Sequence, residues 1–406
     1  MSAGSRTSRT SRVTRTSIVG LVAAAVAVTA FTVPAQAQTG ADGEKGGKAR
    51  QKTQQALDAL VKSGLPGVTA GVRDKGDVWQ GTAGVGDLRA GEARGANDRF
   101  RIGSVTKTFV ATVLLQMEAE GRLSLDDSVE KHLPGVVRGN GNDGRQITVR
   151  QLLNHTSGIF NYTSDPEFGR KHLAAPGFLT HRYDTLAPLD LVKVALSHKP
   201  DFAPGTKHSY SNTGYVLAGL IIEKISGDTY ESEVRDRIIK PLALRATSLP
   251  GNNPHLPKPS ARNYSLLSDP TATEFYDVTA HNMSWGWAAG DMISTTGDLN
   301  RFLSALMRGK LFPAKQLKAM KTAVPAPGDP LYTGYGLGIY NPHNSCDTTL
   351  WGHSGGTPGA VTEAVSSPDG RHTVSYSVNS EGGGGVIDAE FCGDPHSKRL
   401  VPAPVL

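Results

Sequence analysis

The stretch from Phe100 to Phe109, "FRIGSVTKTF", puts Ser104 three residues before Lys107, where the pattern predicts that a long apolar helix begins. Residues three apart share a helix face, so Lys107 could bring its amine to the Ser104 hydroxyl. Ser104 could then be a nucleophile with its activating amine, or it could be an ordinary helix N-cap. The S-x-x-K spacing alone does not decide, because Ser128 and Lys131 repeat it.

The surrounding sequence separates the two copies of this motif. Ser128 lies in the polar, acidic stretch "LSLDDSVEKHLPG", where we expect Lys131 to be solvated. Ser104 precedes "TFVATVLLQMEAEG", in which apolar residues recur at helical spacing until Gly121. A helix this apolar belongs in a core, which would desolvate Lys107. Burial lowers the pKa of an amine and so suits it to proton transfer.

The first 37 residues have the composition of a cleaved signal peptide. Four arginines precede an apolar run over residues 18–33, and the small-residue site "AQA" predicts cleavage between Ala37 and Gln38. A membrane anchor is the alternative, but the run is shorter than the roughly 20 residues that a span needs. No second run of this kind follows. We therefore expect residues 1–37 to be removed and the protein to be secreted without a stable membrane anchor.

The charge, the cysteines and the histidines indicate which partners, disulfides and metal sites to expect. Cleavage would remove four arginines and no acid, so the formal charge falls from +6 to +2 and gives no support for a nucleic-acid partner. Cys346 and Cys392 are the only cysteines, and in an exported chain they predict a disulfide. The twelve histidines show no H-x-H or H-E-x-x-H spacing, so we expect no metal site and no cofactor.

Strand and helix signals fall into separate parts of the chain. Residues 38–50, "QTGADGEKGGKAR", are predicted to be a disordered lead-in. The next segment, "QKTQQALDALVKSG", is predicted to be an amphipathic helix closed by Gly64. Alternating segments around "KGD" and around Pro368-Asp369-Gly370 predict two β-hairpins, one toward each end of the chain.

Between the hairpins the signals are mostly helical. Strands at both ends with helices between them predict an α/β (α+β) fold with an antiparallel sheet and flanking helices. The sheet domain would consist of residues 51–103 plus 285–406, and a mostly helical domain, residues 104–284, would be inserted into it.

Two further motifs accompany Ser104 and Lys107. Tyr210 stands in "SYSNTGY", the one Y-x-N of the chain, just ahead of an apolar helix. His353-Ser354-Gly355, in "LWGHSGGTPG", stands where a strand should begin. A helix start, a loop of the helical domain and a sheet strand are the three positions at which penicillin-recognising serine enzymes carry their motifs.

The chain resembles the serine β-lactamase/DD-peptidase superfamily, in the branch of class C β-lactamases, secreted D-alanyl-D-alanine carboxypeptidases and related esterases. The likeness runs from about residue 51 to 392 and includes "RFRIGSVTK", "ITVRQLLNHTSGI", "PGTKHSYSNTGYVLAG" and "YGLGIY…WGHSGG". It is greatest to the soluble, exported carboxypeptidases. The resemblance implies a monomeric D-Ala-D-Ala carboxypeptidase that acts on peptidoglycan stem peptides and is acylated by penicillins and other β-lactams. A β-lactamase or esterase is the near alternative, and a non-hydrolytic binder of cell-wall peptides or β-lactams is the alternative of another class.

The resemblance also implies roles for the motif residues. Ser104 would attack a carbonyl and form an acyl-enzyme, and Lys107 and Tyr210 would share its proton. An ammonium beside a phenol favours phenolate, so Tyr210 is the expected base. Asn212 would bind the substrate's amide oxygen or hold Lys107. The backbone N–H groups of Ser104 and Gly356 would form the oxyanion hole.

The remaining site residues are expected to line the pocket: His353, Ser354, Gly355, Thr357 and Trp285. For Trp285, ordinary core packing is an equal alternative. His155 in "NHTSGI" looks like a protease motif, but in this family the segment is a structural loop, and we expect the same here.

One departure from the carboxypeptidases bears on the substrate. They carry an arginine about a dozen residues before the third-motif histidine, where it grips a free C-terminal carboxylate. The corresponding stretch, "GIYNPHNSCDTTLWGH", has Tyr340 near that place and no arginine or lysine. The reaction type is unaffected, but the departure weakens the assignment of the substrate, because an ester, a lactam or a cross-linked peptide lacks that terminal carboxylate or presents it differently.

Overall fold

A nine-stranded antiparallel sheet lies at the centre of the fold, and its strand order is β10-β11-β12-β13-β14-β15-β1-β2-β3. The computed structural model describes Met1 and residues 44–397. The strands are β1 (Gly67–Asp74), β2 (Asp77–Asp87), β3 (Glu92–Ala93), β10 (Val324–Pro325), β11 (Tyr332–Tyr335), β12 (Tyr340–Pro342), β13 (Trp351–Thr357), β14 (Ala360–Ser366) and β15 (His372–Val378).

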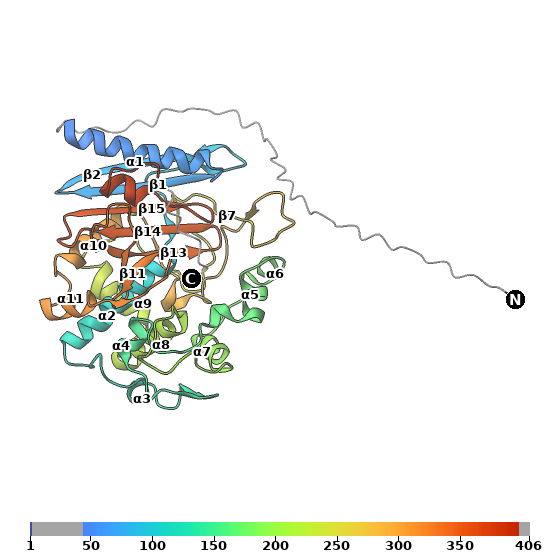
Figure 1. The fold of residues 1–406 in the computed structure, drawn as a ribbon, viewed down its shortest axis with the longest axis vertical. Helices are drawn as coiled ribbons and strands as arrows, with labels where there is room; N and C mark the ends of the chain where they lie inside the picture. The colour runs from blue at the N-terminus through green and yellow to red at the C-terminus, as the bar shows by residue number, and fades with distance from the viewer. Residues whose placement is uncertain (2–43, 398–406) are drawn as a thin grey trace. The chain divides into compact units, whose positions relative to one another are not determined.

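The two predicted hairpins form the middle of this sheet. β1 and β2 join through Lys75 and Gly76, both with positive φ, as the two-residue turn of a twisted hairpin requires. β14 and β15 join across residues 367–371. β1 also pairs with β15, from Val68 opposite Val378 onward. The blue and red strands therefore lie side by side in Figure 1, which confirms a sheet built from the N- and C-terminal segments.

Helices cover both faces of the sheet. α1 (Glu44–Lys62) and α12 (Val386–Phe391) pack on one face around Leu57, Val68 and Val374. α10 (Thr296–Met307) packs on the other face, against β1, β14 and β15. α1 ends before Gly64 as predicted, but it begins at Glu44. The prediction of disorder is therefore wrong for residues 44–50. An ion pair between Arg50 and Glu390 of α12 anchors this end of the helix, a long-range contact that composition cannot indicate.

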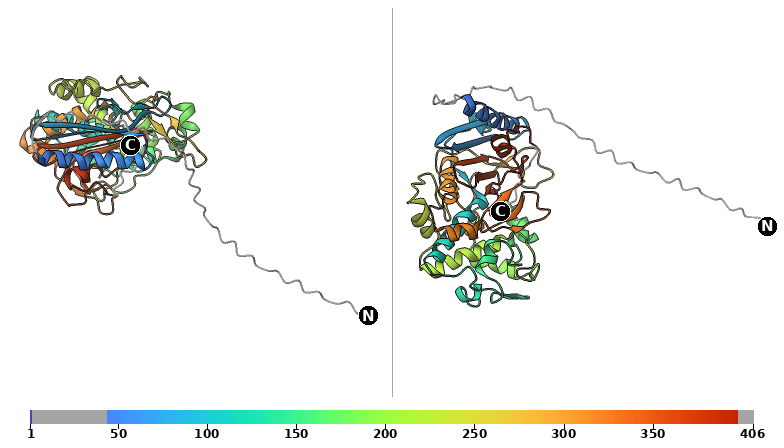
Figure 2. Two further views of the ribbon diagram at one scale, coloured as in Figure 1. Left: turned by 90° about the horizontal axis from the view of Figure 1, so that it is seen from above. Right: turned by 60° about the vertical axis from the view of Figure 1, so that its left-hand side comes forward.

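The segment between β4 (Phe100–Arg101) and β9 (Ile293–Ser294), which pair with each other, is mainly helical. Its helices gather below the sheet in Figure 1 and at one end in the right-hand view of Figure 2. They are α2 (Thr106–Ala119), α3 (Val129–His132), α4 (Val149–Leu153), α5 (Pro166–His172), α6 (Gly177–His181), α7 (Pro188–Leu196), α8 (Asn212–Ser226) and α9 (Tyr230–Val234).

Shorter elements complete the described chain. They are two small hairpins, β5 (Arg138–Gly139) with β6 (Asn142–Asp143) and β7 (Tyr264–Ser265) with β8 (Tyr276–Asp277), and the helix α11 (Ala314–Met320). The described residues from 44 onward group in one compact unit. The domain boundaries at 104 and 284 stay a prediction, and residues 1–37 lie outside the described residues except for Met1.

The core runs from the inserted helices to the sheet. α2 is buried over most of its length, and Phe109 stacks on Phe302 of α10 with ring centroids 3.7 Å apart. The predicted disulfide is present: Cys346 and Cys392 have Cα atoms 5.5 Å apart, and the bond ties the segment before β13 to the end of α12. No helix among the described residues is long and apolar enough to cross a membrane.

Candidate active site

The Ser104–Lys107 pair lies where α2 begins. A short turn of 3₁₀ helix, η1 (Gly103–Val105), carries Ser104, and the N-cap of α2 is Val105, so Ser104 does not cap the helix. The Lys107 Nζ lies 2.7 Å from the Ser104 Oγ. Ser104 is 2% exposed and Lys107 is fully buried. The sequence thus places a hydroxyl and an amine in contact inside the core.

Two more acceptors hold the amine of Lys107. Nζ donates to the Asn212 Oδ1 at 2.7 Å and to the carbonyl of Ala289 at 2.8 Å. Asn212 is itself fixed, because its side chain donates to the Thr163 hydroxyl and its backbone N–H to the Asn161 side chain. Of the two roles expected for Asn212, the structure shows the one in which it holds Lys107.

Burial sets the charge state of this centre. It lowers the pKa of Lys107 well below the ordinary value for lysine. It raises the pKa of Tyr210, an effect that a hydrogen bond with Ser104 only partly opposes. The Lys107 Nζ lies 4.9 Å from the centre of the Tyr210 ring. Both shifts favour a neutral amine and a neutral phenol. They do not favour the phenolate expected for Tyr210, because desolvation acts against both charges, and its role as the base stays a prediction.

Close packing brings η1 against β13. A Cβ added to Gly355 would lie 2.0 Å from the Ile102 carbonyl oxygen and 2.6 Å from the Ser104 nitrogen. One added to Gly103, whose φ is +49°, would lie 2.8 Å from the Gly356 nitrogen. Glycines are needed where two backbones approach this closely. The backbone nitrogens of Ser104 and Gly356, the two expected oxyanion donors, therefore lie in one neighbourhood.

The third motif begins with a locked, neutral histidine. The Tyr335 hydroxyl donates to the His353 Nε2 at 2.7 Å, while Nδ1 donates to the carbonyl of Ser354. Burial, and the nearby Lys107, lower the pKa of His353 to about 3. With both ring nitrogens engaged, His353 has no free nitrogen to act as a base.

Strand alternation separates the other residues of the motif. Gly355 faces η1, so His353 and Thr357 lie on this face and Ser354 lies on the opposite one, beside Glu363 of β14. The Thr357 hydroxyl is buried, with no hydrogen-bond partner in the described part of the chain. A bound substrate could satisfy it. The expected substrate contact of Ser354 stays a prediction.

Trp285 and Tyr340, two aromatic residues considered in the sequence, have different surroundings. Trp285 belongs to the main hydrophobic core, and its carbonyl accepts a hydrogen bond from the Tyr162 hydroxyl, so its role as a pocket wall stays a prediction. Tyr340 lies beside the third motif. It pairs across β12 and β13 with Gly352, and its ring centre is 4.9 Å from that of His353 and 4.8 Å from that of Tyr332. An aromatic cluster of Tyr332, Tyr335 and Tyr340 thus borders His353.

The second S-x-x-K copy is an ordinary helix cap. The Ser128 hydroxyl accepts a hydrogen bond from the backbone N–H of Lys131 at the start of α3. The Lys131 side chain is 60% exposed and pairs with Asp127 at 2.7 Å. The sequence context had predicted this solvated lysine, and the structure confirms it.

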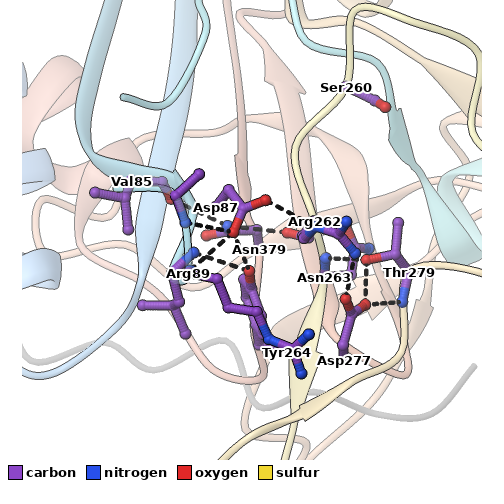
Figure 3. A network of polar contacts seen from close by, with 12 residues as sticks. Val85, Asp87, Arg89, Ser260, Arg262, Asn263, Tyr264, Asp277, Thr279 and Asn379 are labelled. Carbon is purple, nitrogen blue, oxygen red and sulfur yellow. Dashed lines mark hydrogen bonds and ion pairs between the residues drawn. The ribbon is translucent and has the colours of Figure 1, made fainter. Parts of the chain in front are cut away.

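A polar network elsewhere ties β2 to the loops around β7 and β8 (Figure 3). Arg262 bridges Asp87 at 2.8 Å and Asp277 at 2.5 Å, and Asp277 accepts a hydrogen bond from the Thr279 hydroxyl. These residues border a cavity of about 700 Å³ that none of the predicted site residues line. Among the described residues, no group of three or more His, Cys, Asp or Glu side chains could hold a metal ion.

Sequence reasoning missed four contributors to the site. Asn161 and Thr163 support the centre from a short 3₁₀ helix (Tyr162–Ser164) and its N-cap, and the Ala289 carbonyl from another (Trp287–Ala289). Both turns are too short to show a periodic pattern. Tyr335 lies in "YGLGIY", a segment that carried the resemblance, so its partner role could have been sought there.

A buried serine in contact with a neutral amine suits acyl transfer to the serine. On this sheet-and-helix architecture, the centre defines the class of serine hydrolases with the β-lactamase/transpeptidase-like fold. The chain belongs to the Beta-lactamase family, whose profile matches residues 50–391.

One known protein resembles this chain over part of its length, and two solved structures resemble it over most of its length. The chain is 29% identical over 252 residues to penicillin-binding protein 4 of Amycolatopsis lactamdurans, and this match covers 61% of each protein's length. A D-stereospecific amidohydrolase from Streptomyces sp. is 52% identical, with a TM-score of 0.80 over 84% of this chain and 98% of its own. A D-amino acid amidase from Ochrobactrum anthropi SV3, complexed with L-phenylalanine amide, is 29% identical, with a TM-score of 0.71 over 82% of this chain and 91% of its own.

Proposed function

We propose that this protein is a serine amidohydrolase, acylated at Ser104 by amides and esters of D-amino acids that carry no free carboxylate beyond the scissile bond. The observation that carries the proposal is the environment of His353. Tyr340 packs beside it, and residues 337–352 contain no arginine or lysine. A carboxylate entering a partly dry pocket needs a cationic partner to offset its lost hydration. The likeness to a D-stereospecific amidohydrolase supports the same substrate class.

The contacts of Ser104 with Lys107 suggest a path for the Ser104 hydroxyl proton during acylation. As the Ser104 Oγ bonds to the carbonyl carbon, its proton passes to the neutral amine of Lys107, 2.7 Å away. The N–H groups of Ser104 and Gly356 stabilise the oxyanion. Tyr210 gives its phenolic proton to the departing nitrogen and regains one from the Lys107 ammonium. Water then attacks the ester, its proton returns by the same groups, and the acid leaves Ser104.

A D-Ala-D-Ala carboxypeptidase acting on peptidoglycan stem peptides, the activity expected from the sequence, is the second candidate. The likeness to a penicillin-binding protein favours it. Both candidates use the same acyl-enzyme, and both differ from a β-lactamase, which must also release a penicilloyl group rapidly. A non-hydrolytic binder would not need the Lys107 contacts.

One set of substrates separates these candidates. We expect kcat/KM for a D-phenylalanine amide to exceed that for its L-enantiomer and that for an N-blocked D-Ala-D-Ala peptide, each by at least tenfold. The charge-assisted bond that arginine would supply contributes about 1.5–3 kcal/mol, which corresponds to roughly tenfold to a hundredfold. A clear preference for the peptide with the free carboxylate would overturn the proposal in favour of the carboxypeptidase.

We also propose that the protein is secreted as a monomer after cleavage of residues 1–37. The leader composition and the Cys346–Cys392 disulfide support export, since disulfides persist in oxidising compartments. Mass spectrometry of protein recovered from culture medium should find an N-terminus at Gln38, and retention of the leader on a cell-bound protein would contradict this.

A further inference from the structure

His155, expected to belong to a structural loop, contacts the catalytic Tyr210 and the residue on each side of it. Its carbonyl accepts the backbone N–H of Ser209 at 2.9 Å, and its ring Nδ1 accepts the backbone N–H of Ser211 at 3.1 Å. Between them, the Tyr210 ring packs on the His155 ring with centroids 4.2 Å apart. One residue therefore fixes the backbone on both sides of Tyr210 and one face of its side chain.

His155, which we call the clamp on Tyr210, is itself held in place by its surroundings. His155 is 1% exposed and directly follows α4 and Asn154, with φ at +59°. The neighbouring Thr156 donates its N–H to the Gln151 carbonyl and accepts the N–H of Gly205, which ties the loop before Tyr210 to α4. A residue held in the left-handed region needs support from its surroundings, and these bonds supply it.

The His155 ring also contacts Tyr335, which belongs to the aromatic cluster of Tyr332, Tyr335 and Tyr340 beside His353. The Tyr335 ring stands edge-on at 4.5 Å, and its hydroxyl is the partner of His353. Tyr335 also contacts the Tyr210 ring, with centroids 6.2 Å apart, so the rings of His155, Tyr210 and Tyr335 pack against one another. Among the described residues, no hydrogen bond or ring contact joins His155 to Ser104, so a change at His155 would act on the site through neighbours such as Tyr210.

The hydrogen bonds also fix the protonation of the ring. Because Nδ1 accepts the Ser211 N–H, the ring proton of the neutral form lies on Nε2, which has no hydrogen-bond partner among the described residues. Burial, with His208 and Lys107 nearby, lowers the pKa of His155. The clamp thus adds no charge beside the amine of Lys107.

We propose that His155 is a positioning residue: it holds the Tyr210 phenol in the position from which the phenol protonates the leaving group. The inference rests on the proposed acyl-transfer function and assigns no direct contact with substrate. An amide nitrogen must be protonated to depart, whereas a p-nitrophenolate departs without a proton. A displaced Tyr210 should therefore slow amide hydrolysis far more than hydrolysis of the p-nitrophenyl ester of the same D-amino acid.

The test compares these two substrates in matched variants. General acid catalysis contributes typically 10²–10⁴-fold, so we expect His155→Leu to lose at least thirtyfold in kcat/KM on the amide and less than threefold in kcat/KM on the ester. The comparison uses kcat/KM because this constant reports acylation, the step in which the two leaving groups differ. His155→Asn, which tolerates positive φ and keeps an acceptor near the Nδ1 position, should recover much of the amide rate. Tyr210→Phe should show the same selective loss, and the double variant with His155→Leu should lose no more.

The control is another buried histidine. His281 is fully buried, with Nδ1 bonded to the Val278 carbonyl, and has no described contact with Tyr210. His281→Leu should disturb packing without changing the amide-to-ester ratio. If His155→Leu yields no folded protein, His155→Gln, whose polar atoms cannot overlay Nδ1, carries the same comparison.

Equal losses on both substrates, or additive losses in the double variant, would overturn the positioning role. Failure of the proposed function would look different, because the wild-type protein would then hydrolyse neither substrate.

Discussion

Ser104 and Ser128 each precede a lysine by three residues, and the two lysines meet opposite surroundings. Lys107 is enclosed by the Ser104 hydroxyl, a side-chain amide and a carbonyl, with no carboxylate bonded to its Nζ. Lys131 pairs with Asp127 in solvent. A buried amine without a counter-charge gives up its proton, whereas a solvated, paired amine keeps it. The local motif is the same, and burial alone makes one copy reactive.

The charge state of Lys107 predicts the pH dependence of acylation. The reactive form is the neutral amine, so kcat/KM rises with pH as the ammonium of Lys107 loses its proton. Since burial lowers the pKa of Lys107 well below 10.5, we expect the rise to be complete well below that pH. Hydrolysis of a D-amino acid ester, corrected for its spontaneous rate, measures the profile. A rate that keeps rising through pH 10 would show an ordinary, solvated lysine.

Individual elements were predictable where their pattern is local. The hairpins at Lys75–Gly76 and at residues 367–371 follow from alternation and turn residues, and α2 follows from its apolar spacing. The support of the site was not predictable. The Ala289 carbonyl reaches Lys107 across 182 residues of sequence, and nothing local to either residue indicates the contact.

The close contact between η1 and β13 predicts that a methyl group added at Gly355 lowers activity. Gly355→Ala would place a Cβ 2.0 Å from the Ile102 carbonyl oxygen, which η1 and β13 can relieve only by moving apart. Separating the two oxyanion donors should lower kcat/KM by roughly 10²–10³-fold, the loss seen when one donor is removed. Gly297→Ala on α10, where nothing lies within 4 Å of the added carbon, is the matched control. Wild-type kinetics for Gly355→Ala would contradict the packing of η1 on β13.

At the scale of the whole molecule, burial lowers the pKa of several histidines, and this affects how the stability of the fold varies with pH. Burial lowers the pKa of His353 to about 3 and that of His172 to about 4, and lowers the pKa of His281 as well. In the unfolded chain these groups take up protons near pH 6.5. Below that pH the unfolded state binds more protons than the folded state, so the folded state loses stability as the pH falls.

We therefore expect the free energy of unfolding to decrease between pH 6.5 and pH 4.5. Each histidine that stays neutral in the fold should contribute up to about 1.4 kcal/mol per pH unit. Burial raises the pKa of four carboxyl groups, which act in the opposite direction: Asp201, Glu223, Asp291 and Glu381. Urea unfolding across this range measures the slope, and His281→Gln should reduce it. Stability that is constant or increases toward pH 4.5 would contradict the neutral, buried histidines.

We expect Ser104 alone to become acylated, and intact-protein mass spectrometry tests this directly. Wild-type protein, Ser104→Ala and Ser128→Ala would each be mixed with a D-amino acid ester and with a penicillin, then quenched in acid over a time course. We expect a mass increase of one acyl group in wild type and in Ser128→Ala, located at Ser104 by peptide mapping, and no increase in Ser104→Ala. An adduct that survives in Ser104→Ala, or one that is lost in Ser128→Ala, would contradict the assignment.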